Sequence, residues 1–164
     1  MVDVNVGRLA KWLRALGYDA VFVPDVDDGG LVNIAQREGR VVLTKDGRML
    51  ERRVFTTGQL KAIHIRSDRY AEQVRQVVEE LGLDTSRYFT RCIECNVPFV
   101  ALPKEQARQR IPPFVFQTQE EFMECPTCHK VYWRGTHWKN MRAELAQALR
   151  QADASQDAGK KAAG

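Results

Sequence analysis

The chain has 164 residues, of which 44% are hydrophobic and 28% charged, and its formal net charge is +4. This composition is typical of a soluble globular protein and argues against a disordered chain, and no apolar stretch approaches the roughly 20 residues that a transmembrane helix needs. The length predicts one ordinary domain with a small second one, and the N-terminus lacks the pattern of a signal peptide, so the cytoplasm is the expected location.

The first 85 residues alternate short β-branched runs with helical patterns, which indicates successive βα units and a mainly parallel sheet. Four strands are predicted, at residues 2–4, 20–23, 41–44 and 62–65. Apolar spacing predicts helices at about 9–16, 31–35 and 69–81, with a short one near Met49. Gly17 and Gly82 stand where glycine commonly ends a helix. The predicted fold class is α/β, with about four parallel strands and flanking helices.

Near Thr85 the pattern changes to short strands, prolines and paired cysteines. We therefore predict an α/β domain at 1–86, a cysteine-containing module at 87–141, and a C-terminal helix with a disordered tail at 142–164. The helix would turn Met141, Leu145 and Leu149 to one face. Lys and Arg exceed Asp and Glu by 14 to 13 in residues 1–90 and by 11 to 8 in residues 91–164, so most of the basic surplus lies in the second part.

The four cysteines form two Cys-x-x-Cys pairs, Cys92 with Cys95 and Cys125 with Cys128. Two such pairs can surround one Zn²⁺ with four sulfurs, whereas disulfides or a redox dithiol are weaker interpretations in a cytosolic chain. The insert between the pairs is longer than in usual zinc ribbons, so a long hairpin with strands at 97–102 and 131–133 is expected. His129 is interpreted as a surface residue. Because four thiolates leave no open position, this zinc would be structural and catalysis would lie elsewhere.

Each predicted strand of the first domain is accompanied by aspartate at its carboxyl end. These residues are Asp3, then Asp25, Asp27 and Asp28, then Asp46, and finally Asp68. Ligand sites of parallel α/β sheets lie at that edge, and clustered carboxylates need a cation to offset their repulsion. Mg²⁺ or Mn²⁺ suits such oxygen ligands and supports phosphodiester hydrolysis. Taken singly, Asp28 has the alternative role of a helix cap, Asp46 that of a turn residue beside Gly47, and Asp25 is the expected bystander.

At these residues the chain resembles the PIN-like ribonuclease family of the Mut-seven C-terminal type, in which a PIN-fold nuclease domain precedes a zinc ribbon. The matching segments run from about Val2 to Met141 and comprise residues 2–3, 7–14, 17–19, 39–46, 92–95, 125–128 and 131–138. The resemblance implies an Mg²⁺- or Mn²⁺-dependent ribonuclease with acidic metal ligands. It assigns Asp3, Asp46 and Asp28 as ligands, and Asp68 is the fourth acid by position alone. Without Asp68 the site would have three carboxylates.

Basic residues supply candidate contacts for RNA. Arg8 and Lys11 lie on the first predicted helix and Arg48 follows Asp46, so these three are the expected phosphate-binding side chains. The alternative is a solvated helix face, which we also expect for Arg14. Aromatic residues of the 133–138 run could stack on RNA bases, although packing of Trp133 and Trp138 under the ribbon is the favoured interpretation.

Two other functions compete with the nuclease. One is an adaptor whose zinc ribbon binds RNA, the ribosome or an RNA-processing protein, with a weak or inactive acidic site. The other is a phosphatase or receiver-type domain, but that chemistry favours a second acid after the first strand, and Asp3-Val4-Asn5 lacks it. Neither alternative explains both the acids and the cysteines.

Overall fold

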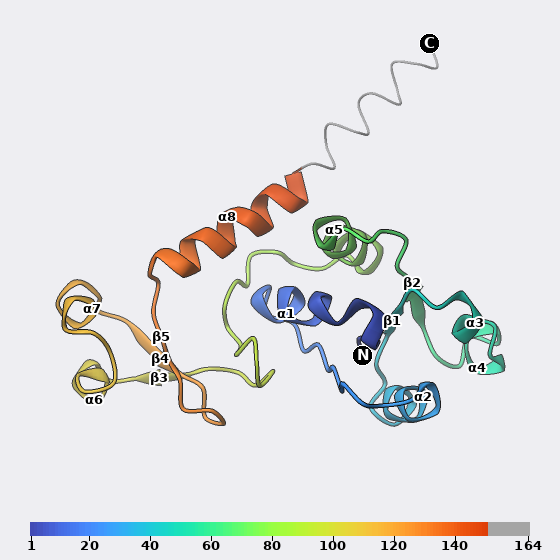
Figure 1. Ribbon diagram of the computed structural model, residues 1–164, viewed down its shortest axis with the longest axis horizontal. Coiled ribbons are helices and arrows are strands. Elements are labelled where there is room, and N and C mark those ends of the chain that lie inside the picture. The colour runs from blue at the N-terminus through green and yellow to red at the C-terminus, as the bar shows by residue number, and fades with distance from the viewer. Residues whose placement is uncertain (151–164) are drawn as a thin grey trace, which may run out of the picture.

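A small parallel sheet lies at the centre of the N-terminal half of the computed structural model, which describes residues 1–150 (Figure 1). Strands β1 (Val42–Thr44) and β2 (Ala62–His64) pair in parallel, with Leu43 opposite Ile63. On the other side of β1, Val2 forms a parallel bridge with Leu43 and a second one with Phe22. The spatial order is therefore Phe22, Val2, Leu43 and Ile63.

The predicted four-stranded sheet is wrong in extent, because two of its four segments pair through a single residue each. The segment at Val2 ends at once, since the Asp3 side chain accepts a hydrogen bond from the Val4 N–H and caps a 3-10 turn over Val4–Val6. The segment at Phe22 runs into Pro24, which has no N–H to donate. Strand pairing therefore ends within two residues of each bridge, at the 3-10 turn after Val2 and at Pro24 after Phe22.

Helices cover both faces of this sheet. They are α1 (Gly7–Ala15), α2 (Asp28–Arg37), the short α3 (Gly47–Leu50) and α4 (Arg53–Thr56), and α5 (Tyr70–Leu81). Leu43 faces a core that it shares with α1 and α5, whereas Val42 faces a second core with α2 and α3. This alternation along β1 confirms an α/β layer arrangement.

Gly17 ends the turn after α1 in a conformation that other residues rarely adopt, with a φ of +87°. A Cβ atom at this position would also lie 2.5 Å from the carbonyl oxygen of Arg87. Glycine is therefore required both by the backbone angle and by the close approach of the segment that leads to the cysteines.

The C-terminal half contains a three-stranded antiparallel sheet with the order β3-β4-β5. Its strands are β3 (Val100–Leu102), β4 (Phe122–Glu124) and β5 (Val131–Tyr132). Between β3 and β4 the chain forms α6 (Lys104–Ala107) and α7 (Pro113–Thr118), which lie beside the sheet in Figure 1. The long insert between the cysteine pairs is therefore not a plain hairpin, because these two helices close a third small core around Leu102 and Phe122.

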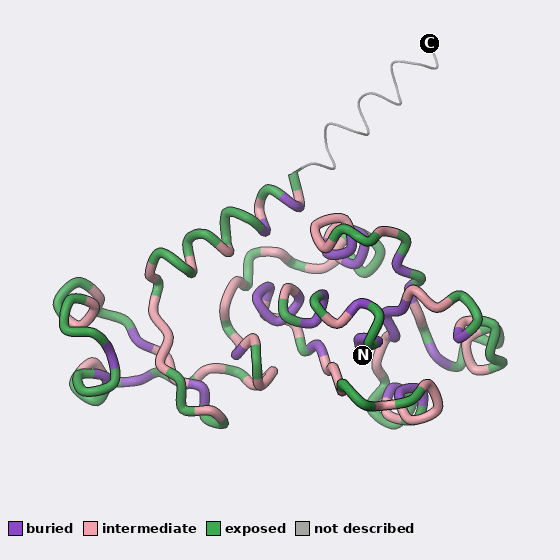
Figure 2. The backbone as a smooth tube through the Cα atoms, in the orientation of Figure 1, coloured by how far each residue is buried: buried purple, intermediate pink, exposed green. Residues whose placement is uncertain are grey.

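The last described helix, α8 (Thr136–Arg150), runs from the antiparallel sheet back to α5 (Figure 1). Its buried residues, Leu145 and Ala148, lie toward its far end, as Figure 2 shows, and Leu145 belongs to the α1–α5 core. The predicted disordered tail lies outside the described residues. Within residues 1–150, no helix is long and apolar enough to cross a membrane.

Candidate metal centre and acidic edge

The two Cys-x-x-Cys pairs form turns with the same backbone hydrogen bonds. In the first turn the Cys92 N–H donates to the Val97 carbonyl at 2.8 Å, and in the second the Cys125 N–H donates to the Lys130 carbonyl at 3.1 Å. The residue after each pair, Asn96 or His129, has a positive φ, of 62° and 58°. His129 therefore completes the turn by its backbone, while its side chain is exposed. We call these two turns the first and second knuckle.

The two knuckles bring all four sulfurs together. The Sγ atoms of Cys92, Cys95, Cys125 and Cys128 lie within 4.8 Å of one another, and none is in a disulfide. Sulfurs at 2.3 Å from a tetrahedral Zn²⁺ would lie about 3.8 Å apart, and the Cys92 and Cys128 Sγ atoms are 4.0 Å apart. The four sulfurs therefore lie close enough together to bind one zinc ion.

Hydrogen bonds to sulfur prepare the cluster for a cation. Desolvation opposes ionisation of Cys92, but donation from the Tyr132 hydroxyl and from the Cys95 and Glu94 N–H groups lowers the pKa of Cys92 to about 7. Desolvation and the neighbouring thiols raise the pKa of Cys95 to about 12. Because four thiolates cannot coexist here without a positive charge, a divalent ion is what would allow all four to lose their protons.

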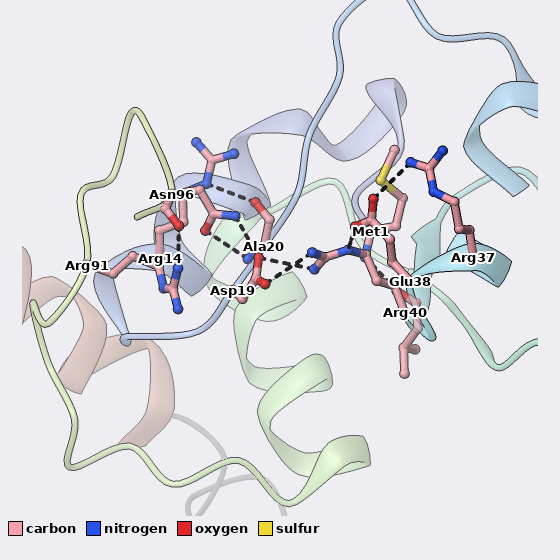
Figure 3. Close-up of polar contacts among 10 residues, drawn as sticks. Met1, Arg14, Asp19, Ala20, Arg37, Glu38, Arg40, Arg91 and Asn96 are labelled. Carbon is pink, nitrogen blue, oxygen red and sulfur yellow. Dashed lines mark hydrogen bonds and ion pairs between the residues drawn. The ribbon is translucent and has the colours of Figure 1, made fainter. Parts of the chain in front are cut away.

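A polar network ties the first knuckle to the N-terminal half (Figure 3). The Arg14 guanidinium is buried and donates to the carbonyls of Ala20, Ile93 and Glu94, each at 2.9 Å. The Asn96 side chain donates to Asp19 at 2.6 Å and accepts from the Ala20 N–H at 3.1 Å. Arg14 was expected on a solvated face, and that expectation is wrong because the knuckle packs over it and supplies carbonyl acceptors.

Replacing Arg14 with methionine is expected to destabilise the protein by about 2–3 kcal/mol, because it leaves the buried Ala20 carbonyl and two partly buried carbonyls without donors. The melting temperature should fall by roughly 5–10 °C. Lys11→Met is the matched control on the same helix, since Lys11 forms only an exposed ion pair with Glu94 at 3.0 Å and should change stability by less than about 0.5 kcal/mol. Equal melting temperatures for the two variants would contradict the assigned role of Arg14.

The acidic edge is built around Asp3, which is only 4% exposed. One carboxylate oxygen of Asp3 accepts from the Val4 N–H, and the other accepts from the Asn5 amide and the Thr44 hydroxyl, each at 2.6 Å. No Lys, Arg or His side chain within residues 1–150 pairs with Asp3. A buried carboxylate that has only neutral donors is an unusual arrangement and is suited to receiving a cation.

Thr44 connects Asp3 to Asp46 across the end of β1. Its hydroxyl donates to Asp3 and accepts from the Asp46 N–H at 2.9 Å. One oxygen of the Asp46 side chain caps α3 by accepting from the N–H groups of Arg48 at 2.8 Å and Met49 at 3.3 Å. Asp46 forms no ion pair with any described residue, so its second oxygen remains available to a ligand.

The other two predicted acids have cationic partners. Asp28 is the first residue of α2, and Asp27 caps that helix. The Asp28 carboxylate lies 3.5 Å from the Arg52 guanidinium. The Asp68 side chain is 93% exposed and contacts the Lys45 ammonium group. Among the described residues, only the cysteines bring three or more potential ligand atoms within 4.8 Å of one another, so the four predicted aspartates do not form a comparable cluster.

A cavity of about 800 Å³ opens beside this edge, over the start of α1. Asn5 and Asp68 line it together with the predicted phosphate-binding residues Arg8 and Lys11. The Arg8 guanidinium lies 5.2 Å from the centre of the Tyr70 ring. Arg48 is exposed in α3 and is not among the lining residues. The cavity thus places two predicted basic contacts next to the Asp3 network.

A family model described as Mut7-C RNAse domain matches residues 1–145, which include both the acidic edge and all four cysteines. The chain belongs to this family. The match confirms the resemblance drawn from the sequence and indicates a ribonuclease-related function. No curated protein and no solved structure was found to match the chain.

In this Mut7-C RNAse domain, sequence reasoning missed two members of the Asp3 network, Asn5 and Thr44. The sequence marks Asn5 only as the place where a second acid is missing, yet its amide donates to Asp3 and its carbonyl oxygen accepts from the Lys45 N–H at 3.1 Å. Thr44 stands in the sequence only as part of the segment before Asp46. A signal was present, since each stands two residues from an aspartate at a strand end, where its side chain can reach the same edge.

Proposed function

We propose that the chain is a ribonuclease that hydrolyses RNA phosphodiester bonds at the acidic edge with the help of Mg²⁺ or Mn²⁺. The observation that carries this proposal is the Asp3 carboxylate, buried among neutral donors and linked through Thr44 to Asp46. A cation there would offset the cost of burying that charge, and oxygen ligands suit these two ions. Membership of the Mut7-C RNAse domain family supports RNA as the substrate.

Asp3 and Asp46 would hold the cation, since neither has a cationic partner among the described residues. Asp28 would become a third ligand once its ion pair with Arg52 breaks. Asp68 would contribute to the site through its ion pair with the Lys45 ammonium group. A bound ion would supply an activated water and would stabilise negative charge on the phosphate oxygens. Asn5 and Thr44 orient the Asp3 carboxylate by donating to the same oxygen.

RNA would approach through the cavity of about 800 Å³ beside Asn5. Arg8 and Lys11 line this cavity, so their positive charges would hold the phosphate backbone against the acidic edge. Arg48, exposed in α3 behind the Asp46 cap, would contact the strand on the other side of the carboxylates. The zinc ribbon would extend the surface that holds the RNA.

The dependence on a divalent ion gives the most direct test. Protein dialysed free of loosely bound ions should leave end-labelled single-stranded RNA intact, and addition of Mg²⁺ or Mn²⁺ should start cleavage, because the attacking water needs the ion. Omitting the ion is preferable to adding a chelator, since a chelator would also attack the zinc site. Zinc content is measured before and after dialysis to show that the ribbon is unchanged. Cleavage at the same rate without added ion would contradict the proposal.

A second candidate is an adaptor that binds RNA or an RNA-processing protein without cutting. It is favoured by the ion pairs of Asp28 with Arg52 and of Asp68 with Lys45, which occupy two of the four acids. An adaptor would bind RNA in the same assay and leave every RNA class intact at all ion concentrations. That outcome would replace the nuclease proposal.

A further inference from the structure

An aromatic cavity lies between the antiparallel sheet and the start of α8. Its volume is about 440 Å³, and five of the residues that line it are the aromatics Phe89, Phe99, Tyr132, Trp133 and Trp138. All five are partly buried, so they are not simply the interior of the ribbon core. Cavities of roughly 300–1,000 Å³ lined mostly by apolar and aromatic groups are the usual form of small-ligand sites. We call this space the ribbon cavity.

The rings of the ribbon cavity are held in place by one another. Phe89 and Trp138 have ring centres 5.6 Å apart, and Phe99 and Tyr132 have ring centres 4.5 Å apart, both pairs in tilted geometry. A Cβ atom at Gly135 would lie 2.6 Å from the Trp133 indole nitrogen, so the absence of a side chain at Gly135 lets the indole lie against the backbone. Rings that are already ordered can stack on a planar ligand at little further cost in conformational entropy.

Two arginines lie beside Trp138, one of the rings that line the cavity. The guanidinium groups of Arg134 and Arg142 lie 5.9 and 5.4 Å from the centre of the Trp138 ring, and Arg142 also lies 5.6 Å from the Tyr88 ring. Arg134 has one acidic neighbour, Glu121, at 3.7 Å on the exposed surface. An aromatic site with arginines beside it matches a ligand that combines a planar base with phosphates, and an apolar peptide would leave these charges unused.

The ribbon cavity is close to the proposed substrate path. Ile93 lines the ribbon cavity, and its neighbour Glu94 lines the cavity of about 800 Å³ that holds Arg8 and Lys11. The two cavities therefore adjoin the same stretch of the first knuckle. A single strand of RNA held by Arg8 and Lys11 would have unstacked bases within reach of the aromatic rings on the other side of the knuckle.

We propose that the ribbon cavity binds an unstacked base of single-stranded RNA, with Arg134 and Arg142 contacting the flanking phosphates. This inference rests on the proposed function in one respect, that RNA is the substrate. Trp133 and Trp138 provide the stacking surfaces, and the base is recognised by its flat face. The site consequently tolerates different bases and selects single strands over duplexes, in which the bases remain stacked.

The proposal is tested by comparing the binding of two 2′-O-methyl strands of eight nucleotides. One strand is oligouridine, and the other is abasic and carries the same number of phosphates. Fluorescence anisotropy at fixed salt without divalent ions should show the wild type binding the base-bearing strand about tenfold or more tightly than the abasic one. Trp133→Leu should remove most of this preference and leave the affinity for the abasic strand unchanged. The control is Phe114→Leu, because Phe114 is 72% exposed on α7 and does not line the cavity. Equal affinity of the wild type for both strands, or an undiminished preference in Trp133→Leu, would overturn the inference.

A measurement on the wild type guards against a variant that fails to fold. Oligouridine containing 4-thiouridine, irradiated in the complex, should crosslink to peptides that carry Trp133 or Trp138, and crosslinks confined to residues 1–86 would overturn the inference. Neither experiment requires cleavage, so the two proposals fail separately. Crosslinking at Trp133 or Trp138 without any cleavage in Mn²⁺ would support the base-binding site and contradict the nuclease proposal. Cleavage in Mn²⁺ with no effect of Trp133→Leu on binding would support the nuclease proposal and contradict the base-binding site.

Discussion

Asp46→Asn is expected to reduce RNA cleavage by more than about 100-fold while the protein stays folded, because the change removes a charge that a divalent ion needs. Asparagine is as good a helix cap as aspartate, so the hydrogen bonds to the Arg48 and Met49 N–H groups can persist. The initial rate of cleavage of labelled RNA in Mn²⁺ measures the effect, and RNA binding should be retained or tightened because the phosphate backbone meets less repulsion.

The matched control for Asp46→Asn is Asp27→Asn. Asp27 caps α2 by accepting from the Gly30 N–H at 2.7 Å, so the same substitution is made at the same type of helix position. The free energy of unfolding of both variants should lie within about 0.5 kcal/mol of the wild-type value, and only Asp46→Asn should lose activity. Asp3→Asn is a harsher test, because the new NH2 group would meet a donor in either orientation, the Val4 N–H in one and the Asn5 and Thr44 donors in the other. If Asp46→Asn and Asp27→Asn cut RNA as fast as the wild type, the acidic edge is not the active site.

Loss of zinc is expected to unfold the cysteine-containing module and to weaken the rest of the chain. Cys125→Ser removes one of four sulfur ligands, and structural zinc sites contribute folding free energy directly. Once the first knuckle loosens, the Arg14 guanidinium loses its acceptors at Ile93 and Glu94, so we expect the α/β part to remain folded but to lose about 1–3 kcal/mol of stability. Elemental analysis gives the zinc content, and hydrogen exchange should become fast in β4 and β5 and intermediate in α1.

His129→Asn is the control for Cys125→Ser, because Asn96 holds the same left-handed position in the first knuckle that His129 holds in the second. It should keep one zinc per chain and an unchanged melting temperature. Full stability of Cys125→Ser without zinc would show that the module does not depend on the metal. Loss of all amide protection in Cys125→Ser would show that residues 1–86 and 87–141 unfold together as one cooperative unit.

Local chemistry made much of the molecule predictable. Apolar residues at helical spacing placed α1, α2, α5 and α8 within a few residues, since one stripe of each helix must meet a core. Gly82 takes the left-handed cap at the end of α5 that its position indicated. The two Cys-x-x-Cys spacings identified a cluster that the structure confirms, because a knuckle is a local turn whose geometry depends on few residues.

The acidic edge was only partly predictable. Strand order brings Asp3 and Asp46 into one network through Thr44, as expected for parallel strands that end at the same side of a sheet. The partners of Asp28 and Asp68 could not be inferred, since Arg52 and Lys45 meet them through the packing of short helices and loops. Whether an acid is free or paired depends on contacts between segments far apart in sequence.

The sequence alone thus determined the longer helices, the cysteines that can bind zinc and the neighbourhood of Asp3 and Asp46, because these follow from spacing along the chain and from parallel strand order. Only the tertiary structure decided that two of the four strands shrink to one bridging residue each, that the insert folds as α6 and α7, and that Arg14 is buried beneath the first knuckle. Each of these outcomes depends on the competition among distant groups for the same hydrogen-bonding and packing positions. Local propensity cannot predict the outcome of that competition, because the stability of each alternative conformation depends on which distant segment packs against it.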